Sequence, residues 1–461
     1  MIGPHRRTRT AARLLTAVAT AFVLGVILLW MVPAALAAAG DATYTFSARG
    51  APIDGLDWGR RICADGSGNV TLGGDCSLDA FTTAMYVYHL SSTGVPEWGG
   101  PWAGSSASSF YDVAVDGSGN VYSAGAEVDP GGGTNYLVAG WQPDGTPLWA
   151  HTYDGPKYND EALAVTTGAD GSVYVTGMSQ GSDMDMDIVT VKYDTAGTRR
   201  WVRRYNGPWD RHDRGLAIAV RGTSVFVAGI SARTTRAGRD WDTVVLRYTT
   251  GGVRKWARLY DDSAGGYEWV TGIAVTGRAV YVCGYGKGDV SAASSNALLL
   301  KYGYSGRRLW AKWVAGVFGG RDAWDDIAIA PGGFVNVTGY VQRAGTGLDA
   351  ATASYRSDGR RRWLRYVASA GAGNDVGEGV AVADDGTTYV GGYGQGSSAT
   401  ADVLAVSYAA DGTPQWTTFW DSGAGADIGH DVAITNGRAW VVGSQASFGF
   451  GDDIIVVGFE R

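Results

Sequence analysis

The chain has 461 residues, including 71 glycines, 18 tryptophans and 24 tyrosines, and a net charge of −7. Abundant glycine and aromatic residues without a collagen-like period predict many short strands joined by tight turns. The negative charge argues against nucleic acid and anionic membrane surfaces as partners.

Residues 1–37 have the composition of a secretory signal peptide. Four arginines precede an almost uninterrupted apolar run at 14–32, and an Ala-Leu-Ala cleavage pattern follows at 35–37. Without this segment, which holds no acidic residue, the net charge becomes −11. We therefore expect a secreted or cell-surface protein with 38–461 as its mature part. The alternative is an uncleaved segment, in which 14–32 anchors the protein at the membrane.

After an extended segment at 42–50, hairpins recur at intervals of about 53 residues. Each consists of two alternating strands around a Gly/Asp/Asn turn, as in YDVAVDGSGNVYSAG (Tyr111–Gly125). Eight such hairpins begin near Ile62, Tyr111, Ala162, Gly215, Val270, Trp324, Gly377 and Gly429.

A second hairpin follows in the first seven units and leads to a tryptophan. These residues are Trp98, Trp149, Trp201, Trp256, Trp310, Trp363 and Trp416. A turn such as YDTAGTRRW (Tyr193–Trp201) precedes each of them. Each unit therefore has four strands, named A to D in chain order, which predicts a propeller blade.

The eighth unit ends at Arg461 after its C strand. The segment at 42–50 can supply the missing D strand, which would close the ring and remove its exposed edges. We predict an all-β propeller of eight four-stranded blades, formed by residues 38–461 as one domain.

The repeat resembles the SBBP family of bacterial β-propeller repeats, whose units read A-V-D-x-x-G-N-V-Y-V-T-G followed by D-x-x-x-x-K-Y-D-x-x-G-x-x-x-W. The similarity is strongest over Ala164–Trp201 and extends over nearly all of the mature chain. The family is usually described as seven-bladed, against the eight units counted in this chain. It has no single activity, so the resemblance implies a fold rather than a function.

The two faces of such a ring differ in their loops. The A–B and C–D turns are short and uniform and emerge on one face, because successive strands alternate in direction. The B–C loops and D–A links emerge on the other face and vary, as binding loops usually do. On this variable face the candidate ligand-binding residues are Trp58, Trp209, Asp213, Trp241, Trp269, Asp322, Trp324 and Asp325.

Aromatic rings beside carboxylates suit sugars, whose apolar faces stack on rings while their hydroxyls reach carboxylates, and they also suit cationic groups. The alternative is that the tryptophans beside the A strands fill gaps between blades. Residues repeated in every blade are interpreted as structural, since a binding site is normally built once.

Other motifs give weaker signals. Asp183, Asp185 and Asp187 alternate like calcium ligands, but they lack the Gly and the distant Glu of an EF-hand, so we favour a solvated acidic loop and expect no cofactor. Residues 177–181 match G-x-S-x-G without the helix that a nucleophile elbow needs. The D-x-x-G-x-x-x-W turns also resemble quinoprotein dehydrogenases, whose adjacent Cys-Cys pair this chain lacks.

The three cysteines cannot all pair within the chain. Cys63 and Cys283 occupy places where other repeats have Ala114 or Thr176, so we interpret both as buried strand residues. A Cys63–Cys76 disulfide stays open as an alternative, because secreted proteins fold in an oxidising compartment.

These observations favour a non-catalytic binding or scaffold protein whose variable face holds a glycan, another surface polymer or a protein. One alternative is an enzyme, either carbohydrate-active through a carboxylate pair or quinoprotein-like. Another alternative is a structural module of a surface assembly.

Overall fold

The structure, a computed structural model, describes residues 30–31, 39–48, 57–77, 82–102, 104, 107–155, 159–233, 240–262, 266–286, 294–317, 320–369, 373–396, 400–423, 425–435, 437–447 and 451–461. The predicted signal segment, 1–37, lies outside these residues except for 30–31, so its cleavage or anchoring stays a prediction. No helix in the described part is long and apolar enough to cross a membrane.

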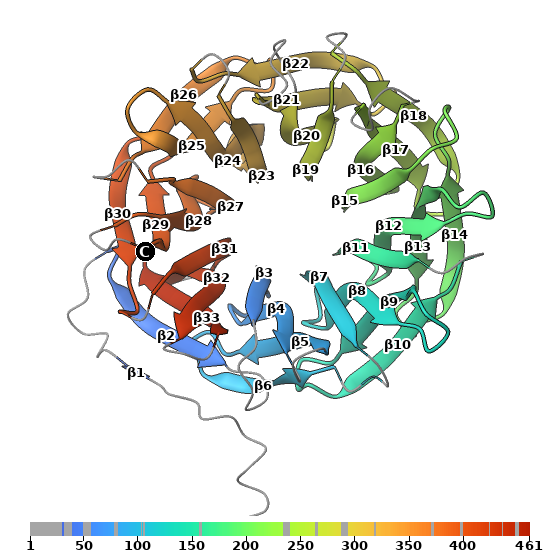
Figure 1. The fold of residues 1–461 in the computed structure, drawn as a ribbon, viewed down its shortest axis with the longest axis horizontal. Helices are drawn as coiled ribbons and strands as arrows, with labels where there is room; N and C mark the ends of the chain where they lie inside the picture. The colour runs from blue at the N-terminus through green and yellow to red at the C-terminus, as the bar shows by residue number, and fades with distance from the viewer. Residues whose placement is uncertain are drawn as a thin grey trace, which may run out of the picture.

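Eight antiparallel sheets stand as blades around a central axis (Figure 1). Blades 1 and 2 comprise β3 (Trp58–Ala64), β4 (Val70–Ser77), β5 (Thr83–Leu90) and β6 (Pro96–Pro101), then β7 (Ser108–Val115), β8 (Val121–Val128), β9 (Thr134–Trp141) and β10 (Pro147–Tyr153). Blades 3 and 4 comprise β11 (Asp160–Thr167), β12 (Val173–Gln180), β13 (Met186–Tyr193) and β14 (Arg199–Tyr205), then β15 (Asp213–Arg221), β16 (Ser224–Ala232), β17 (Trp241–Thr249) and β18 (Arg254–Tyr260).

Blades 5 and 6 comprise β19 (Glu268–Val275), β20 (Ala279–Gly286), β21 (Asn296–Gly303) and β22 (Arg308–Val314), then β23 (Asp322–Ala330), β24 (Phe334–Arg343), β25 (Gly347–Tyr355) and β26 (Arg361–Val367). Blade 7 comprises β27 (Val376–Val382), β28 (Thr388–Gly394), β29 (Asp402–Tyr408) and β30 (Pro414–Trp420). The first strand of each blade lines the centre of the ring, as Figure 1 shows. The eight-bladed propeller predicted from the sequence is thus confirmed.

The last blade joins the two ends of the chain. It contains β31 (Asp427–Ile434), β32 (Arg438–Ser447) and β33 (Gly451–Glu460), and its outer strand is β2 (Ala42–Ala48), which pairs antiparallel with β33. The two-residue β1 (Trp30–Met31) pairs with the outer edge of β2. Phe46 of β2 is buried in a cluster that includes Leu72 of blade 1, so this strand also seals the contact between blades 8 and 1.

The core lies between neighbouring blades rather than within any one of them. The B strands are covered on both faces, and all eight residues of β12 are buried. The outer D strands, by contrast, keep an exposed face.

The repeated tryptophan seals the outer part of each contact between blades. Trp201 packs on Gly252, which lies in the C–D turn of the next blade, and its Nε1 donates a hydrogen bond of 3.0 Å to the carbonyl of Thr250. Gly252 has φ +82°, and a Cβ there would lie 2.9 Å from the indole, so this position needs glycine. The same packing on a glycine with positive φ joins Trp98 to Gly145, Trp149 to Gly197, Trp256 to Gly306, Trp310 to Gly359 and Trp363 to Gly412.

The N-terminal segment reproduces this contact for blade 8. Gly40, at φ +89°, packs on Trp416, and the Thr418 hydroxyl donates a 2.7 Å hydrogen bond to the Gly40 carbonyl. The turn before β2 thus takes the place of a C–D turn.

All three cysteines are free thiols. Cys63 pairs with Thr71 of β4, and Thr71 is five residues from Cys76 on that strand. At the rise of a β-strand this separates the two cysteines by about 16 Å, beyond the reach of a disulfide.

Candidate functional site

The innermost strand of every blade carries a β-bulge at the same place. The register shifts by one residue, for example between Ala162 and Ala164 of β11 and between Gly377 and Gly379 of β27. The extra residues, which we call the bulge ring, are Arg60, Tyr111, Leu163, Leu216, Thr271, Asp325, Glu378 and His430. A bulge re-aims a side chain and is common beside functional sites.

Six of these eight residues line a cavity of about 390 Å³ in the central channel. They are Arg60, Tyr111, Leu163, Leu216, Glu378 and His430, and Trp58 and Arg61 complete the wall. The volume falls within the range of small-ligand sites. Because Trp58 begins β3, the cavity lies toward the face from which the D–A links and B–C loops emerge.

In four blades the residue after the bulge adds a second layer of charge, formed by Arg61, Asp112, Asp326 and Asp431. Asp112 accepts a 2.8 Å hydrogen bond from the N–H of Val165 in the next blade, and Asp326 makes the equivalent 2.8 Å bond with Val380. Asp431 accepts one of 3.1 Å from Ile62. These carboxylates therefore join adjacent innermost strands while remaining half-buried at the channel.

Crowding in the channel shifts the titration of its carboxyl groups. Burial raises the pKa of Asp112 to about 6 and that of Glu378 to about 7, although Arg61 opposes both shifts. Burial and then the charge of Asp431 raise the pKa of Asp326 to about 7. Burial and the neighbouring carboxylate of Glu378 hold the pKa of Asp325 well above its usual range. Part of this carboxyl cluster is therefore protonated at neutral pH.

Two cationic residues and a histidine face these carboxyl groups. Arg61 lies inside the ring, but its side chain is exposed to solvent because the channel is open to water. Burial, then the charges of Arg60 and Arg61, lower the pKa of His430 to about 4. His430 is therefore a neutral imidazole at pH 7 and can accept a hydrogen bond.

The bulge ring is divided into two arcs. Blades 6, 7, 8, 1 and 2 contribute Asp325, Glu378, His430, Arg60 and Tyr111, whereas blades 3 and 4 contribute two leucines and blade 5 contributes Thr271 between the arcs. One wall of the channel is therefore charged and the opposite wall apolar, which suits a ligand with a polar edge and an apolar face.

Two of the residues predicted from the sequence belong to this region. Trp58 lines the cavity with 39 % of its surface exposed, and its Nε1 lies 3.3 Å from the carboxylate of Asp452. The Arg60 guanidinium lies 5.3 Å from the centre of the Trp58 ring. Asp325 is the bulge residue of blade 6.

Three other predicted residues are buried within the fold. Trp324 has no exposed surface and packs in the cluster between blades 5 and 6, so it presents no surface to a ligand. The carboxylates of Asp213 and Asp322 accept hydrogen bonds from the backbone N–H groups of Gly207 and Gly316 in the preceding D–A links.

Trp209, Trp241 and Trp269 form a separate group near the contact between blades 4 and 5. The Trp241 and Trp269 rings meet edge to face at 6.3 Å, and the Arg233 guanidinium lies 4.9 Å from the Trp209 ring. None of the three lines the channel cavity.

The acidic loop considered as a calcium site contacts Arg204, Arg211 and His212. Asp187 forms a 2.8 Å ion pair with Arg204, and Asp185 lies 3.6 Å from the Nδ1 of His212. Asp183 is exposed, and its carboxylate accepts a 3.3 Å hydrogen bond from the backbone of Asp185. The solvated loop favoured from the sequence, with calcium binding as the alternative, stays a prediction.

The site residues predicted from the sequence do not include Arg60, Arg61, Tyr111, Glu378 or His430. The aligned repeats could have indicated this position. Just before the apolar end of the A strand, the residue type changes from repeat to repeat instead of being repeated. The bulge that turns this position toward the channel is visible only in the paired strands.

A second cavity, of about 300 Å³, lies in the contact between blades 1 and 2. Trp98, Trp102 and Trp141 contribute to its wall. It arises where β6 carries Gly99 and Gly100, while the equivalent strand β14 has Val202 and Arg203. This cavity therefore arises because two glycines replace larger residues, and no cluster of polar groups among the described residues lines it.

Comparison with known proteins supports the fold alone. No family model and no curated protein matches the sequence. Sqt1 from Chaetomium thermophilum is 12% identical with a TM-score of 0.53, over 89% of this chain and 99% of that chain. The β-propeller domain of the trilobed protease from Pyrococcus furiosus is 9% identical with a TM-score of 0.44, over 76% and 95%. The WD40 β-propeller domain of Doa1 is 11% identical with a TM-score of 0.37, over 75% and 91%.

Proposed function

We propose that this propeller is a secreted or cell-surface binding protein without catalytic activity, and that its central channel receives a saccharide unit of a glycan or surface polymer. The observation that carries the proposal is the bulge ring, in which one repeated position places arginine, tyrosine, two leucines, glutamate and histidine around a cavity. Repetition is broken at this position, which is where a site built once would lie.

The chemistry of the wall fits a sugar. The exposed ring of Trp58 and the aliphatic side chains of Leu163 and Leu216 can contact the apolar face of a pyranose. Glu378, His430 and Arg60 supply hydrogen-bond acceptors and donors for its hydroxyls. A cavity of about 390 Å³ is large enough for a small ligand or the end of a longer chain.

Thermal unfolding of the mature protein with a panel of soluble and cell-wall polysaccharides tests the proposal. A saccharide that binds the folded state should raise the melting temperature, with about 2.7 kcal/mol of added stability at a hundredfold excess over its Kd. We expect Trp58→Ala and Glu378→Gln to reduce the affinity at least tenfold. Trp209→Ala, which changes a half-buried tryptophan away from the channel, is the matched control and should bind normally.

Equal losses in Trp58→Ala and Trp209→Ala would contradict the channel as the binding site. A melting temperature that no polysaccharide shifts would contradict the saccharide, and the structural-module alternative would then be favoured.

The raised pKa of Glu378 supports one enzymatic alternative, a glycosidase. Glu378 lines the cavity with a pKa of about 7, so it can hold a proton at neutral pH, as the general acid of a glycosidase must. Release of reducing sugar that disappears in Glu378→Gln, with binding retained, would favour this hydrolase over the binding protein.

A further inference from the structure

At five junctions, an aspartate at the start of the A strand holds the incoming link in place. Asp160, Asp213, Asp322, Asp375 and Asp427 each accept a hydrogen bond from one backbone N–H of the preceding D–A link, at 2.5–2.7 Å. The donors are Gly155, Gly207, Gly316, Ser369 and Ser422. A small donor residue and a short acid therefore define the regular junction between blades.

The junction between blades 4 and 5 departs from this pattern at both positions. The place of the glycine or serine donor is taken by Asp262, directly after Asp261, and the place of the aspartate by Glu268. Asp262 adds a carboxylate where the other junctions have glycine or serine, and Glu268 is one methylene longer than the aspartate it replaces, so at these two positions this junction carries one more acid than the others.

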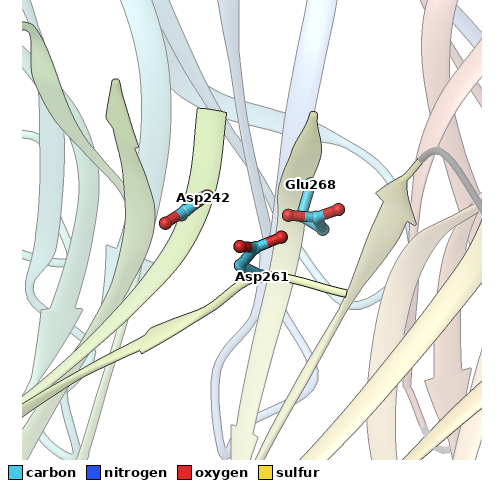
Figure 2. A group of neighbouring side chains, drawn as sticks. All are labelled: Asp242, Asp261 and Glu268. Atoms are coloured by element: carbon cyan, nitrogen blue, oxygen red, sulfur yellow. The ribbon is translucent and has the colours of Figure 1, made fainter. Parts of the chain in front are cut away.

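Three carboxylates converge at this junction (Figure 2). They come from Asp242 at the start of β17, Asp261 in the D–A link and Glu268 at the start of β19. One oxygen from each lies within 4.8 Å of the others, and among the described residues this is the one group spaced to hold a metal ion. Asp242 and Glu268 are each only 1 % exposed.

Glu268 is unsatisfied in this arrangement. Neither of its carboxylate oxygens has a hydrogen-bond partner within the described part of the chain. A buried carboxylate without partners is strongly destabilising unless it is protonated or paired with a cation. Figure 2 shows that its carboxylate lies beside that of Asp261.

One arginine offsets part of this negative charge. Arg233 lies 3.2 Å from a carboxylate oxygen of Asp242 and forms an ion pair with Asp261. It has no ion pair with Glu268 among the described residues, while Asp240 and Asp262 add two further acids to the electrostatic surroundings of Glu268. The junction therefore keeps a negative excess that a bound cation would balance.

We propose that Asp242, Asp261 and Glu268 bind one divalent cation, with Ca²⁺ favoured, which joins blade 4 to blade 5. All three ligands are carboxylate oxygens, the donor type of hard cations, and the set contains no histidine or cysteine. Ca²⁺ tolerates irregular coordination by mixed carboxylates, whereas Mg²⁺ demands near-octahedral geometry. The site is distinct from the loop at Asp183, Asp185 and Asp187.

Terbium luminescence of the mature protein tests the site directly. Trp241 and Trp269 are the sequence neighbours of two proposed ligands, so bound Tb³⁺ should be sensitised by tryptophan excitation and displaced by Ca²⁺. We expect Glu268→Gln to lower Tb³⁺ and Ca²⁺ affinity at least tenfold, and Asp261→Asn to act in the same direction. Asp375→Asn, at the equivalent place in blade 7, and Asp183→Asn should leave the affinity unchanged.

Thermal unfolding with Ca²⁺ or a chelator supplies the second measurement. Ca²⁺ should raise the melting temperature of the wild type and of Asp375→Asn, and the shift should vanish in Glu268→Gln. In chelator, Glu268→Gln should be at least as stable as the wild type, because the substitution removes a buried charge without partners.

Three results would overturn the proposal. They are the absence of Tb³⁺ and Ca²⁺ binding to the wild type at millimolar concentration, unchanged affinity in Glu268→Gln, and a loss of affinity in Asp183→Asn alone. The last would place the cation at the loop in blade 3. If Glu268→Gln fails to fold, Asp261→Asn decides the question, since Asp261 is partly exposed.

Discussion

The perimeter of the ring and its channel use the same repeat in opposite ways. At the perimeter, a tryptophan packs on a glycine of the next blade at successive junctions, with the same partners each time. At the channel, the bulge position changes chemistry from blade to blade around a water-accessible cavity. In a closed ring, a contact that must hold every junction is repeated, whereas a site that must recognise one ligand is varied.

The largest expected effect comes from breaking the perimeter. Trp201→Ala removes a buried indole, its hydrogen bond to Thr250 and its packing on Gly252. We expect a loss of about 3–5 kcal/mol in the free energy of unfolding, measured by chemical denaturation. A loss below about 1 kcal/mol would show that the junctions do not depend on this contact.

A smaller effect is expected where the perimeter is already incomplete. Trp98 is half-buried and borders the cavity between blades 1 and 2, although its Nε1 makes a 2.8 Å hydrogen bond to Pro143. Trp98→Ala should therefore cost about 1–2 kcal/mol in the same denaturation assay. Equal losses for Trp98→Ala and Trp201→Ala would mean that the cavity does not weaken this junction.

The channel carboxyl groups should make stability depend on pH. Because the pKa of Glu378 rises from 4.5 in the unfolded chain to about 7, its contribution is full below pH 4.5 and is lost as the pH rises through 7. His430 acts in the opposite sense, since its contribution is full above pH 6.5 and is lost as the pH falls through 4.

Chemical denaturation of the Glu378→Gln variant between pH 5 and 8 isolates the contribution of Glu378 to the free energy of unfolding. The decline in stability over this range should be shallower than in the wild type by about 1 kcal/mol, a value reduced for the water in the channel. Asp183→Asn should keep the wild-type slope. A steeper decline in Glu378→Gln would contradict the proposed protonation of this carboxyl.

The smallest effect on stability is expected within the apolar arc of the channel. Leu163→Ala changes a half-buried side chain in the bulge ring that faces the cavity, so its cost should stay below about 1 kcal/mol. Saccharide affinity in the same variant should nevertheless fall several-fold. A large loss of stability without a change in binding would assign Leu163 to the core instead.

The sequence alone determined the architecture because the repeat carries its own evidence. Hairpins, turn glycines and tryptophans recur at a regular spacing. The eighth repeat contains only three of the four strands, so residues 42–50 are left to supply the fourth. The pairing of β2 with β33 follows from that shortage, since an unpaired edge is unfavourable.

Only the tertiary structure decided which residues face one another. Trp58 lies two residues before the bulge residue of its strand and opens onto the channel, whereas Trp324 lies one residue before its own and is sealed between blades. A single-residue bulge decides whether a position faces the channel or the neighbouring blade, and alternation along the sequence cannot reveal it. The carboxylates of Asp242, Asp261 and Glu268 likewise meet only because the ring brings two blades together at their edges.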